Sequence, residues 1–576
     1  MYSISRITNI FFGLFFIALP CLSLFTDYLI ADDLIILYMN LIIVIFCLFH
    51  LLHKLDRHTC LTVTHIDILC LLYLIYCIFN AYYTRENEMP YIWRYTILNL
   101  VLGYLLIRSY PQKPIIINAL IISGTLQSVI AILQSINKIH GNNDFFQITG
   151  TFQNPGPLGG FLGLSFIFTI KCFLDKKKDK RKFLLFIPLI LMGYGLLLSD
   201  SRSAWIATFS VSNYILYKYI IRDEKIKSFF LKMKQSFIIK LLFMFICLSC
   251  LTITYLYKQN SANGRLLIWQ TTTNMFLDKP LTGQGIGSFK ETNILYQARY
   301  FEKNPHSYFA SVAGYPGYPY NEFLHIASEQ GVIGILFIGG ILFLLYRLPQ
   351  YHRIGKTALY GLSYLFLFSL FSYTFYIISL MFITIGLGGC LSYRPLVSFA
   401  FSKSMKIIAA LCLLSILCVV ISDIKIYKEL RFISISSIHN HKELYDKIKN
   451  NSSFIDNYAQ WAMITMPPDK RLPILRQAEN VVPTVELFND IGDTYSSLFN
   501  TNVAIQYYKK ADLMIPNRIT SKYKLFQIYL GAKDSCCALK WCEKALSGSL
   551  KIENTATLKM KIKMRQFKDI QLCLSN

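Results

Sequence analysis

Residues 264–269 read Gly264-Arg265-Leu266-Leu267-Ile268-Trp269 and open a long polar segment that divides the otherwise apolar part of this chain. The segment continues with Pro280-Leu281-Thr282-Gly283-Gln284-Gly285-Ile286-Gly287 and closes with Asn321-Glu322-Phe323-Leu324 and Glu329-Gln330-Gly331-Val332-Ile333-Gly334. Long apolar blocks flank it on both sides, up to about residue 423. A hydrophobic chain that interrupts itself with this much Gly, Pro, Tyr and Arg predicts a functional site in the interruption.

The composition indicates a protein that crosses a membrane many times. Of the 576 residues, 54% are hydrophobic and only 16% are charged, whereas about a quarter of the residues of a soluble protein are charged. The apolar blocks are long enough to span a bilayer, which takes about 20 residues per helix. The net charge of +25 would also suit a nucleic-acid-binding protein. Most of the charge, however, lies in short loops between apolar blocks, as in cytoplasmic loops, which argues against nucleic acid as a partner.

Thirteen apolar blocks predict an all-α polytopic bundle of about 12–13 transmembrane helices in the lipid bilayer. The first block is long for a signal peptide and lacks a clear cleavage site, so a retained helix is expected there. The blocks cover approximately residues 7–25, 34–52, 66–83, 92–108, 114–134, 157–174, 183–199, 203–221, 238–257, 330–346, 357–374, 376–393 and 405–423.

The basic residues also predict the orientation of the bundle. If the N-terminus is cytoplasmic, every basic-rich short loop falls on the cytoplasmic side. These loops contain Lys54 and Arg57, Arg108 and Lys113, and the segments 176–182, 218–240, 347–356 and 394–406. Because each span carries the chain across the membrane, the segment 258–329 and all residues after 423 then fall on the other side. Since the pattern resembles that of a bacterial inner-membrane protein, that side would be the periplasm.

Residues 424–576 have the composition of a soluble helical domain, distinct from the membrane domain of residues 1–423. A shift of 34 residues aligns Tyr495 with Tyr529, Ala504 with Ala538, Tyr507 with Trp541 and Ala511 with Ala545. This period, with small residues between paired helices, is typical of tetratricopeptide repeats, which bind other macromolecules. A tail of helical hairpins without true repeats is the alternative. The sequence leaves open whether the four cysteines of this domain form a disulfide.

Two arginines at the predicted outer membrane surface are candidates for phosphate binding. Arg202 lies in the turn Ser201-Arg202-Ser203, and Arg265 follows Gly264 just after the ninth span. A guanidinium group offers paired, fixed donors to phosphate oxygens and stays charged, so two of them would suit a diphosphate head group. Phosphate binding is not the only interpretation of these residues. Arg202, which lies beside Asp200, would equally be an anchor at the membrane interface, and Arg265 would equally be an ordinary loop arginine.

Other polar residues are expected near the same surface. Gln153 and Asn154 lie in a turn before the sixth span, where Asn-Pro-Gly-Pro is also ordinary punctuation before a helix. The approach to the tenth span adds titratable candidates: His306, Tyr320, Glu322 and His325. A general base needs a pKa near the working pH, which favours histidine or a perturbed glutamate over tyrosine, whose free pKa is about 10. The tyrosines would equally form an interfacial belt.

Taken together, these motifs resemble the O-antigen ligase / O-antigen polymerase superfamily of polytopic bacterial membrane glycosyltransferases. Each motif is weak alone, but five of them occur in family order across a long external loop. Some members of the superfamily also carry appended tetratricopeptide repeats. The matching motifs are Gly150-Thr151-Phe152-Gln153-Asn154-Pro155, Ser201-Arg202-Ser203, Gly264-Arg265 with Trp269, the run 280–289, and Asn321-Glu322-Phe323-Leu324 followed by the run 329–334.

The resemblance implies transfer of a glycan from an undecaprenyl-diphosphate carrier to an acceptor at the periplasmic membrane face, with no metal and no cofactor. Arg202 and Arg265 match the two arginines that hold the diphosphate. Gln153, Asn154 and Asn321 are further candidates for substrate binding. The acceptor would be lipid A–core, the growing glycan or a protein hydroxyl group. The C-terminal repeats favour lipid A–core or protein, because a repeat surface suits a macromolecular partner.

Tyr320 departs from the family pattern, because a histidine that is favoured as the general base usually precedes this asparagine. Tyr320 would orient the substrate while another group assists, or His306, Glu322 or His325 would act as the base, or the activity would be altered. The first of these is preferred.

A non-catalytic assembly component or a transporter of lipid-linked glycans is the rival interpretation of the function. A transporter should carry paired charges or broken helices at mid-membrane. The predicted spans here keep their charges mostly at the ends, which favours an enzyme at the membrane surface.

Overall fold

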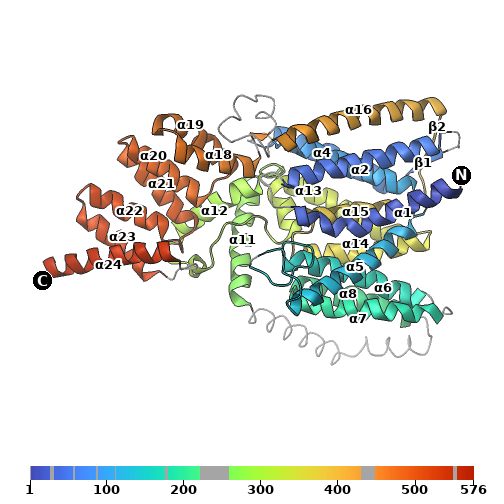
Figure 1. Cartoon of the computed structure of the whole chain (residues 1–576), viewed down its shortest axis with the longest axis horizontal. Helices are drawn as coiled ribbons and strands as arrows, with labels where there is room; N and C mark the ends of the chain where they lie inside the picture. Colours follow the sequence, from blue (N-terminus) through green and yellow to red (C-terminus); the bar gives the residue numbers. More distant parts are fainter. Residues whose placement is uncertain are drawn as a thin grey trace.

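The computed structural model describes residues 2–25, 31–55, 59–85, 89–110, 112–143, 145–175, 180–220, 258–429, 448–449, 451–548 and 554–575. Within these ranges the chain is helical apart from two short strands, which confirms the all-α polytopic class (Figure 1). The ninth predicted span, residues 238–257, lies outside the described residues.

Each of the other twelve predicted spans coincides with a helix. Among the described helices, α2, α3, α5, α6, α13 and α16 are long and apolar enough to cross a membrane, and α1, α7 and α15 contain shorter apolar stretches. The bundle helices are α1 (Tyr2–Ala18), α2 (Ala31–His53), α3 (His65–Tyr83), α4 (Trp93–Ser109), α5 (Pro114–Ser135), α6 (Pro155–Asp175), α7 (Phe186–Leu198), α8 (Arg202–Ile220), α13 (Glu322–Arg347), α14 (Arg353–Ser369), α15 (Ile378–Cys390) and α16 (Lys403–Glu429). Four short 3₁₀ helices complete this part, η1 (Leu19–Phe25), η2 (Lys180–Leu185), η3 (Tyr308–Ser311) and η4 (Thr374–Tyr376).

The connections between these helices gather at two ends of the bundle. At one end, β1 (Thr59–Val63) pairs antiparallel with β2 (Val397–Phe401), and Lys406 Nζ donates to the Lys54 carbonyl oxygen (3.0 Å). At the other end lie α11 (Gln259–Asp278), α12 (Phe289–Lys303) and the C-terminal domain (Figure 1). The basic residues Lys54 and Lys406 therefore lie at the opposite end of the bundle from the long polar segment, as the charge pattern predicts.

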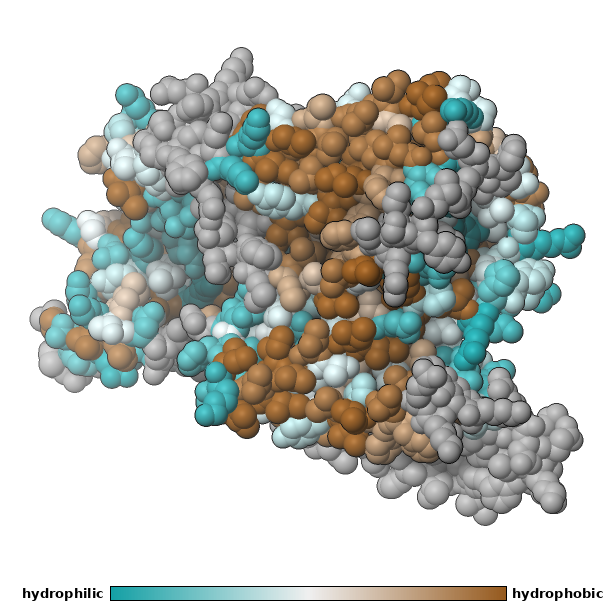
Figure 2. Space-filling view, turned by 45° about the vertical axis from the view of Figure 1, so that its right-hand side comes forward, coloured by the Kyte–Doolittle hydropathy of each residue, from teal (hydrophilic) through white to brown (hydrophobic). Residues whose placement is uncertain are grey.

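The outer surface of the bundle is apolar. Leu71 and Ile75 of α3, Ile190 of α7 and Leu411 of α16 all expose more than half of their side-chain surface. Figure 2 shows apolar surface over the bundle and a more hydrophilic surface over the C-terminal domain. Because soluble proteins rarely leave such large apolar patches in water, lipid is the natural solvent of this surface.

Helix α6 packs into the bundle through its glycines. A Cβ atom at Gly159 would lie 2.5 Å from Ser201 Cβ, and a Cβ atom at Gly163 would lie 2.2 Å from the Tyr364 hydroxyl oxygen. The glycines of α6 thus form a small-residue face that allows close helix packing. It brings the start of α6 against the turn that precedes α8, so two of the sequence motifs become neighbours.

The long polar segment is joined to α13 by main-chain hydrogen bonds across a break in that helix. Gly331 has φ 65° and ψ −161°, which is not helical. The N–H groups of residues 284–285 donate to the carbonyl oxygens of residues 328–329 (2.8 and 2.9 Å), and the Val332 N–H group donates to the Pro280 carbonyl oxygen (2.9 Å). These bonds satisfy main-chain groups that the broken helix leaves without helical partners.

Helix α3 holds the same loop from another side. Asn80 is fully buried, and its Nδ2 donates to the Thr282 carbonyl oxygen (2.7 Å) while its Oδ1 accepts from the Ile286 N–H group (2.8 Å). The Tyr76 hydroxyl group donates to the Gln330 carbonyl oxygen (2.6 Å). The sequence did not single out Asn80, because one asparagine in an apolar span belongs to no recognisable motif.

The C-terminal domain consists of helical hairpins that pack side by side (Figure 1). The four alanines that the 34-residue shift aligns are all buried; they are Ala504, Ala511, Ala538 and Ala545. This burial is as expected for repeats, although the tetratricopeptide assignment stays a prediction. Cys536, Cys537 and Cys542 are free thiols. The helices are α18 (Ser452–Thr465), α19 (Pro468–Val481), α20 (Val485–Ser497), α21 (Thr501–Met514), α22 (Thr520–Gly531), α23 (Ser535–Ser547) and α24 (Thr555–Ser575).

The first hairpins of this domain share a hydrophobic core with the long polar segment. Leu267 of α11 and Ile294 and Phe301 of α12 are buried in one cluster with Phe488 of α20 and Met514 of α21. Burial of such a side chain contributes about 1.5–3 kcal/mol. The domain is therefore fixed to α11 and α12 by an apolar interface.

Substitution of Gly331 tests the junction between the loop and α13. In Gly331→Ala, the new Cβ atom would lie 2.2 Å from the Leu281 carbonyl oxygen in a backbone with positive φ, so we expect a loss of about 2–4 kcal/mol of stability. Gly339→Ala in the same helix is the matched control, because its Cβ atom would meet nothing within 4 Å. Thermal unfolding and size-exclusion profiles in detergent measure the effect. Equal melting temperatures of the two variants would contradict the predicted loss of stability in Gly331→Ala.

Candidate functional site

The turn before α8 places Arg202 at the first position of that helix, at the end of the bundle that carries the long polar segment. Asp200 in this turn has a positive φ of 47° and forms an ion pair with Lys258. The carboxylate that the sequence suggested as a partner of Arg202 therefore pairs with a lysine just before α11. This ion pair joins the α8 turn to the start of α11.

Arg265 lies on the first half of α11 and reaches towards the same place. Its guanidinium carbon lies 4.7 Å from the centre of the Tyr320 ring, and its Nη1 donates to the Phe371 carbonyl oxygen (3.1 Å). Burial lowers the pKa of Arg265, and the nearby positive charge of Arg202 lowers it further, while Tyr320 acts in the opposite direction. The two predicted arginines are thus close enough to repel each other, and an anion between them would relieve this repulsion.

Three tyrosines, Tyr318, Tyr320 and Tyr373, lie around the Arg265 side chain, and Tyr376 packs against them to complete a cluster of four. The Tyr318 and Tyr373 rings stack at 3.7 Å, and the Tyr320 ring meets both edge to face at 5.0 and 5.6 Å. Tyr376 is 5.5 Å from Tyr318. Burial raises the pKa of Tyr318 to about 12, and Tyr320 adds to this effect. Tyr373 and Tyr376 come from the connection between α14 and α15, which the sequence did not indicate as part of the site.

Tyr320 has a backbone conformation that is unusual for a residue with a side chain, with φ 55°. Asn321 follows it and is the N-cap of α13, where its Oδ1 accepts from the N–H groups of Phe323 and Leu324 (2.9 and 3.1 Å). An asparagine in this position satisfies the first open donors of the helix. Asn321 is therefore engaged in positioning Tyr320 and the start of α13.

Glu322 and His325 belong to a buried network inside α13. His325 Nδ1 is 3.3 Å from Glu322 Oε2, and its Nε2 is 3.2 Å from Glu329 Oε1. Glu322 Oε1 also accepts from the Phe375 N–H group (2.9 Å), and Glu329 Oε1 accepts from the Phe289 N–H group (2.9 Å). These contacts connect α13 to η4 and α12. They occupy the polar atoms that a general base would need for the substrate.

The remaining predicted site residues lie in two different places. Asn154 Oδ1 accepts from the Gly156 N–H group (3.0 Å), and a Cβ atom at Gly156 would lie 3.7 Å from the Tyr373 hydroxyl oxygen. The turn that contains Gln153 and Asn154 is thus beside the tyrosine cluster. His306 is exposed in the turn after α12.

Two glutamines that the sequence did not indicate hold this turn in place. Gln134 Oε1 accepts from the N–H groups of Thr149 and Gly150 (3.0 and 2.8 Å), and Gln127 Oε1 accepts from the Thr151 N–H group (3.0 Å). Both glutamines are buried in α5. They belong to no sequence motif. The one feature of the sequence that could have indicated them is that they are polar residues within an apolar span.

A cavity of about 260 Å³ lies next to Arg265, between α11, α12 and the loop 312–320. Gly264, Tyr318 and Tyr320 form the part of its lining nearest to the arginine. The cavity is enclosed by the residues of the polar segment and adjoins the core shared with the C-terminal domain. It offers space for a substrate group near Arg265.

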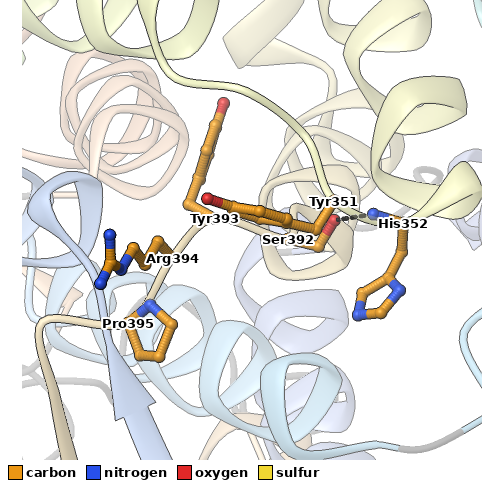
Figure 3. A pocket seen from close by; sticks show the side chains of 6 residues that line it. All are labelled: Tyr351, His352, Ser392, Tyr393, Arg394 and Pro395. Carbon is orange, nitrogen blue, oxygen red and sulfur yellow. Dashed lines mark hydrogen bonds between the residues drawn. The ribbon is translucent and has the colours of Figure 1, made fainter.

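A second cavity, of about 340 Å³, lies at the opposite end of the bundle (Figure 3). It is lined by Tyr351 and His352 before α14 and by residues 392–395 after α15, and the His352 N–H group donates to Ser392 Oγ (3.0 Å). None of the predicted site residues lines it. We therefore place the candidate site at the other end, around Arg202, Arg265 and Tyr320.

One part of the chain is similar to a known protein family. A search for similar curated proteins found no match. Residues 187–339 match the family model for O-antigen ligase. The matched region contains Arg202, Arg265, Tyr320 and Asn321 and ends in α13 beyond the break at Gly331. The matched motifs are the ones that converge on the candidate site, so the part of the chain that forms this site is similar to the O-antigen ligase family.

Proposed function

We propose that this protein transfers a glycan from an undecaprenyl-diphosphate carrier to a hydroxyl group of an acceptor, at the periplasmic surface of a bacterial inner membrane. The observation that carries the proposal is that the charges of Arg202 and Arg265 interact, and that Arg265 lies over the ring of Tyr320, which lines a cavity. The two arginines come from different helices and are more than 60 residues apart in sequence. A dianionic group would offset the repulsion between them.

The reaction breaks the bond between the anomeric carbon of the glycan and the diphosphate oxygen. A new bond forms between the same carbon and the acceptor oxygen, and the proton of the acceptor hydroxyl group leaves with the diphosphate. Negative charge grows on the leaving oxygen as the first bond breaks. Arg202 and Arg265 would stabilise this charge through charge-assisted hydrogen bonds. The undecaprenyl chain would lie along the apolar outer surface of the bundle.

We propose that Tyr320 positions Arg265 and the acceptor instead of removing a proton. Its ring lies under the guanidinium group of Arg265 at cation–π distance. Its strained backbone is held between the tyrosine cluster and the Asn321 cap. Such a residue fixes the direction of the guanidinium donors, which matters because poor orientation alone can slow a reaction strongly.

Glu322, His325 and Glu329 are best assigned a positioning role, because the three side chains satisfy one another and two main-chain N–H groups. They fix η4, which carries Tyr376, and the start of α12. A departing diphosphate can itself accept the proton of the acceptor, so none of the three needs to be a base in this scheme. Gln153, Asn154 and Asn321 would shape the rim of the site.

The C-terminal domain lies at the same end of the bundle as the site (Figure 1). A lipid A–core or protein acceptor held by this domain would approach the cavity directly, which favours these two acceptors over the growing glycan. A transporter is disfavoured because the main-chain groups at the break in α13 are bonded to the loop 280–285 instead of being left open to a transported ion or substrate.

Reconstitution with a labelled undecaprenyl-diphosphate glycan and a set of candidate acceptors tests the proposal. Cleavage of the carrier bond with transfer of the label would support a glycosyltransferase, and the labelled product would identify the acceptor. Movement of intact labelled lipid across the membrane without cleavage would support the rival transporter.

The arginines give the sharpest prediction for this scheme. We expect Arg202→Ala and Arg265→Ala each to lower the rate of transfer about 10²–10³-fold, which is the usual effect of removing one donor to a transition-state charge. Arg299→Ala is the control, since this arginine of α12 is mostly exposed and faces Asp278 at 3.7 Å. Transfer at the wild-type rate by either site variant, at equal protein level, would refute the diphosphate clamp.

Tyr320 gives a second prediction, which separates its ring from its hydroxyl group. Tyr320→Phe keeps the ring under Arg265, so its rate of transfer should stay within about threefold of the wild-type rate. Tyr320→Ala removes the cation–π contact of about 1–2 kcal/mol, so its rate of transfer should fall tenfold or more. His306→Ala should transfer normally. A Tyr320→Phe variant as inactive as Tyr320→Ala would assign the chemistry to the hydroxyl group instead.

A further inference from the structure

The cavity at the end of the bundle opposite the candidate site has no part in the proposed function. Its volume of about 340 Å³ falls within the ~300–1,000 Å³ of ligand pockets. Figure 3 shows its lining, with Arg394 and His352 on opposite sides of Tyr351 and Ser392. Two connections form it, one between α13 and α14 and one between α15 and β2. The cavity therefore lies at the end of the bundle where β1 pairs with β2.

Hydrogen bonds to Ser392 fix the two connections against each other. The buried Gln350 accepts from the Ser392 N–H group through Oε1 (2.8 Å). The Tyr351 N–H group donates to the Ser392 carbonyl oxygen (3.0 Å), and the His352 N–H group donates to Ser392 Oγ (3.0 Å). The wall of the cavity is thus held by bonds within the protein, and its shape does not depend on a ligand.

The cavity carries cationic side chains that the protein itself does not neutralise. Arg394 and His352 are exposed, and neither side chain forms an ion pair or a hydrogen bond with a described residue. Arg353, the next residue, instead pairs with Asp175 at 2.8 Å. Residues 330–422 include no Asp or Glu, although six of them are Lys or Arg. The local charge is therefore positive, which favours an anionic ligand.

Apolar side chains continue directly from the cavity lining. Leu396, Val397 and Phe399 follow Pro395 along the chain, and each exposes about half of its side-chain surface (45%, 50% and 55%). Tyr351 in the lining is also largely exposed. Aromatic and basic residues gather where the head groups of a bilayer meet its acyl chains. A lipid would cover both the cationic and the apolar part of this surface, whereas a soluble anion would leave the apolar part in water.

We propose that this cavity binds the head group of an anionic phospholipid of the surrounding bilayer, of the phosphatidylglycerol class. The Arg394 guanidinium group donates paired hydrogen bonds to the phosphate oxygens, and the His352 imidazole donates one more. The acyl chains lie against Leu396 and Phe399. Because the lipid contacts both connections that form the cavity, it stabilises this end of the bundle.

Lipid binding to the full-length protein in a neutral detergent tests the proposal. Native mass spectrometry measures the affinity for phosphatidylglycerol and for the zwitterionic phosphatidylcholine. We expect phosphatidylglycerol to bind the wild type about tenfold more tightly, and Arg394→Gln to lose this preference because its charge-assisted hydrogen bonds are gone. His352→Gln, which removes the second donor, should weaken phosphatidylglycerol binding about threefold.

Lys356→Gln is the matched control, because it removes one positive charge from the same basic stretch. Lys356 is exposed on α14 and does not line the cavity, so its loss should change the affinity by no more than about twofold. Arg265→Ala, at the other end of the bundle, should keep the preference for phosphatidylglycerol. Glycerol 3-phosphate, which carries the phosphate without acyl chains, should compete only weakly.

The melting temperature checks that the variants are folded. Arg394→Gln should melt like the wild type without added lipid, since the side chain has no partner to lose, and should gain less stability from phosphatidylglycerol. Equal binding of the two lipids by the wild type would overturn the proposal, as would equal weakening in Arg394→Gln and Lys356→Gln. Competition by glycerol 3-phosphate as strong as that by the lipid would assign the cavity to a soluble anion. Loss of binding in Arg265→Ala, with normal binding in Arg394→Gln, would place the lipid at the candidate site instead.

Discussion

The main-chain hydrogen bonds between residues 280–285 and the broken start of α13 support every other part of the site. A membrane helix cannot leave its N–H and C=O groups unpaired in an apolar environment. The break at Gly331 is tolerated because a loop supplies the missing partners, and the glycines of both segments allow the two backbones to meet. A Cβ atom at Gly283 would lie 2.3 Å from the Glu329 carbonyl carbon. The two glycine-rich motifs thus form one joint.

This joint determines where the functional side chains lie. It fixes the first turns of α13, whose N-cap is Asn321 and whose preceding residue is Tyr320. Tyr320 then meets Arg265 of α11 and the tyrosines that follow α14. Arg202 and Arg265 bring two positive charges close together, while the side chains of Glu322, His325 and Glu329 contact one another. The arginine pair is the group suited to an anionic substrate, and the buried network is suited to holding helices together.

The C-terminal domain also helps to hold the site, from beyond the end of the bundle. Its first hairpins share an apolar core with α11 and α12, and their polar groups reach the loop that lines the cavity. Truncation of this domain would therefore expose the back of the site as well as remove a binding surface.

The sequence by itself determined the membrane class and the helix positions, and it indicated Arg202 and Arg265 as candidates for the site. These features follow from long apolar blocks, charge in short loops and local motifs, all of which are visible without coordinates. Only the tertiary structure decided that Asp200 pairs with Lys258, that Tyr373 and Tyr376 join Tyr320, and that Asn80, Gln134 and Gln297 hold the loops. The physical reason is that a buried polar residue acts through partners far away in sequence, and its own neighbours along the chain carry no sign of them.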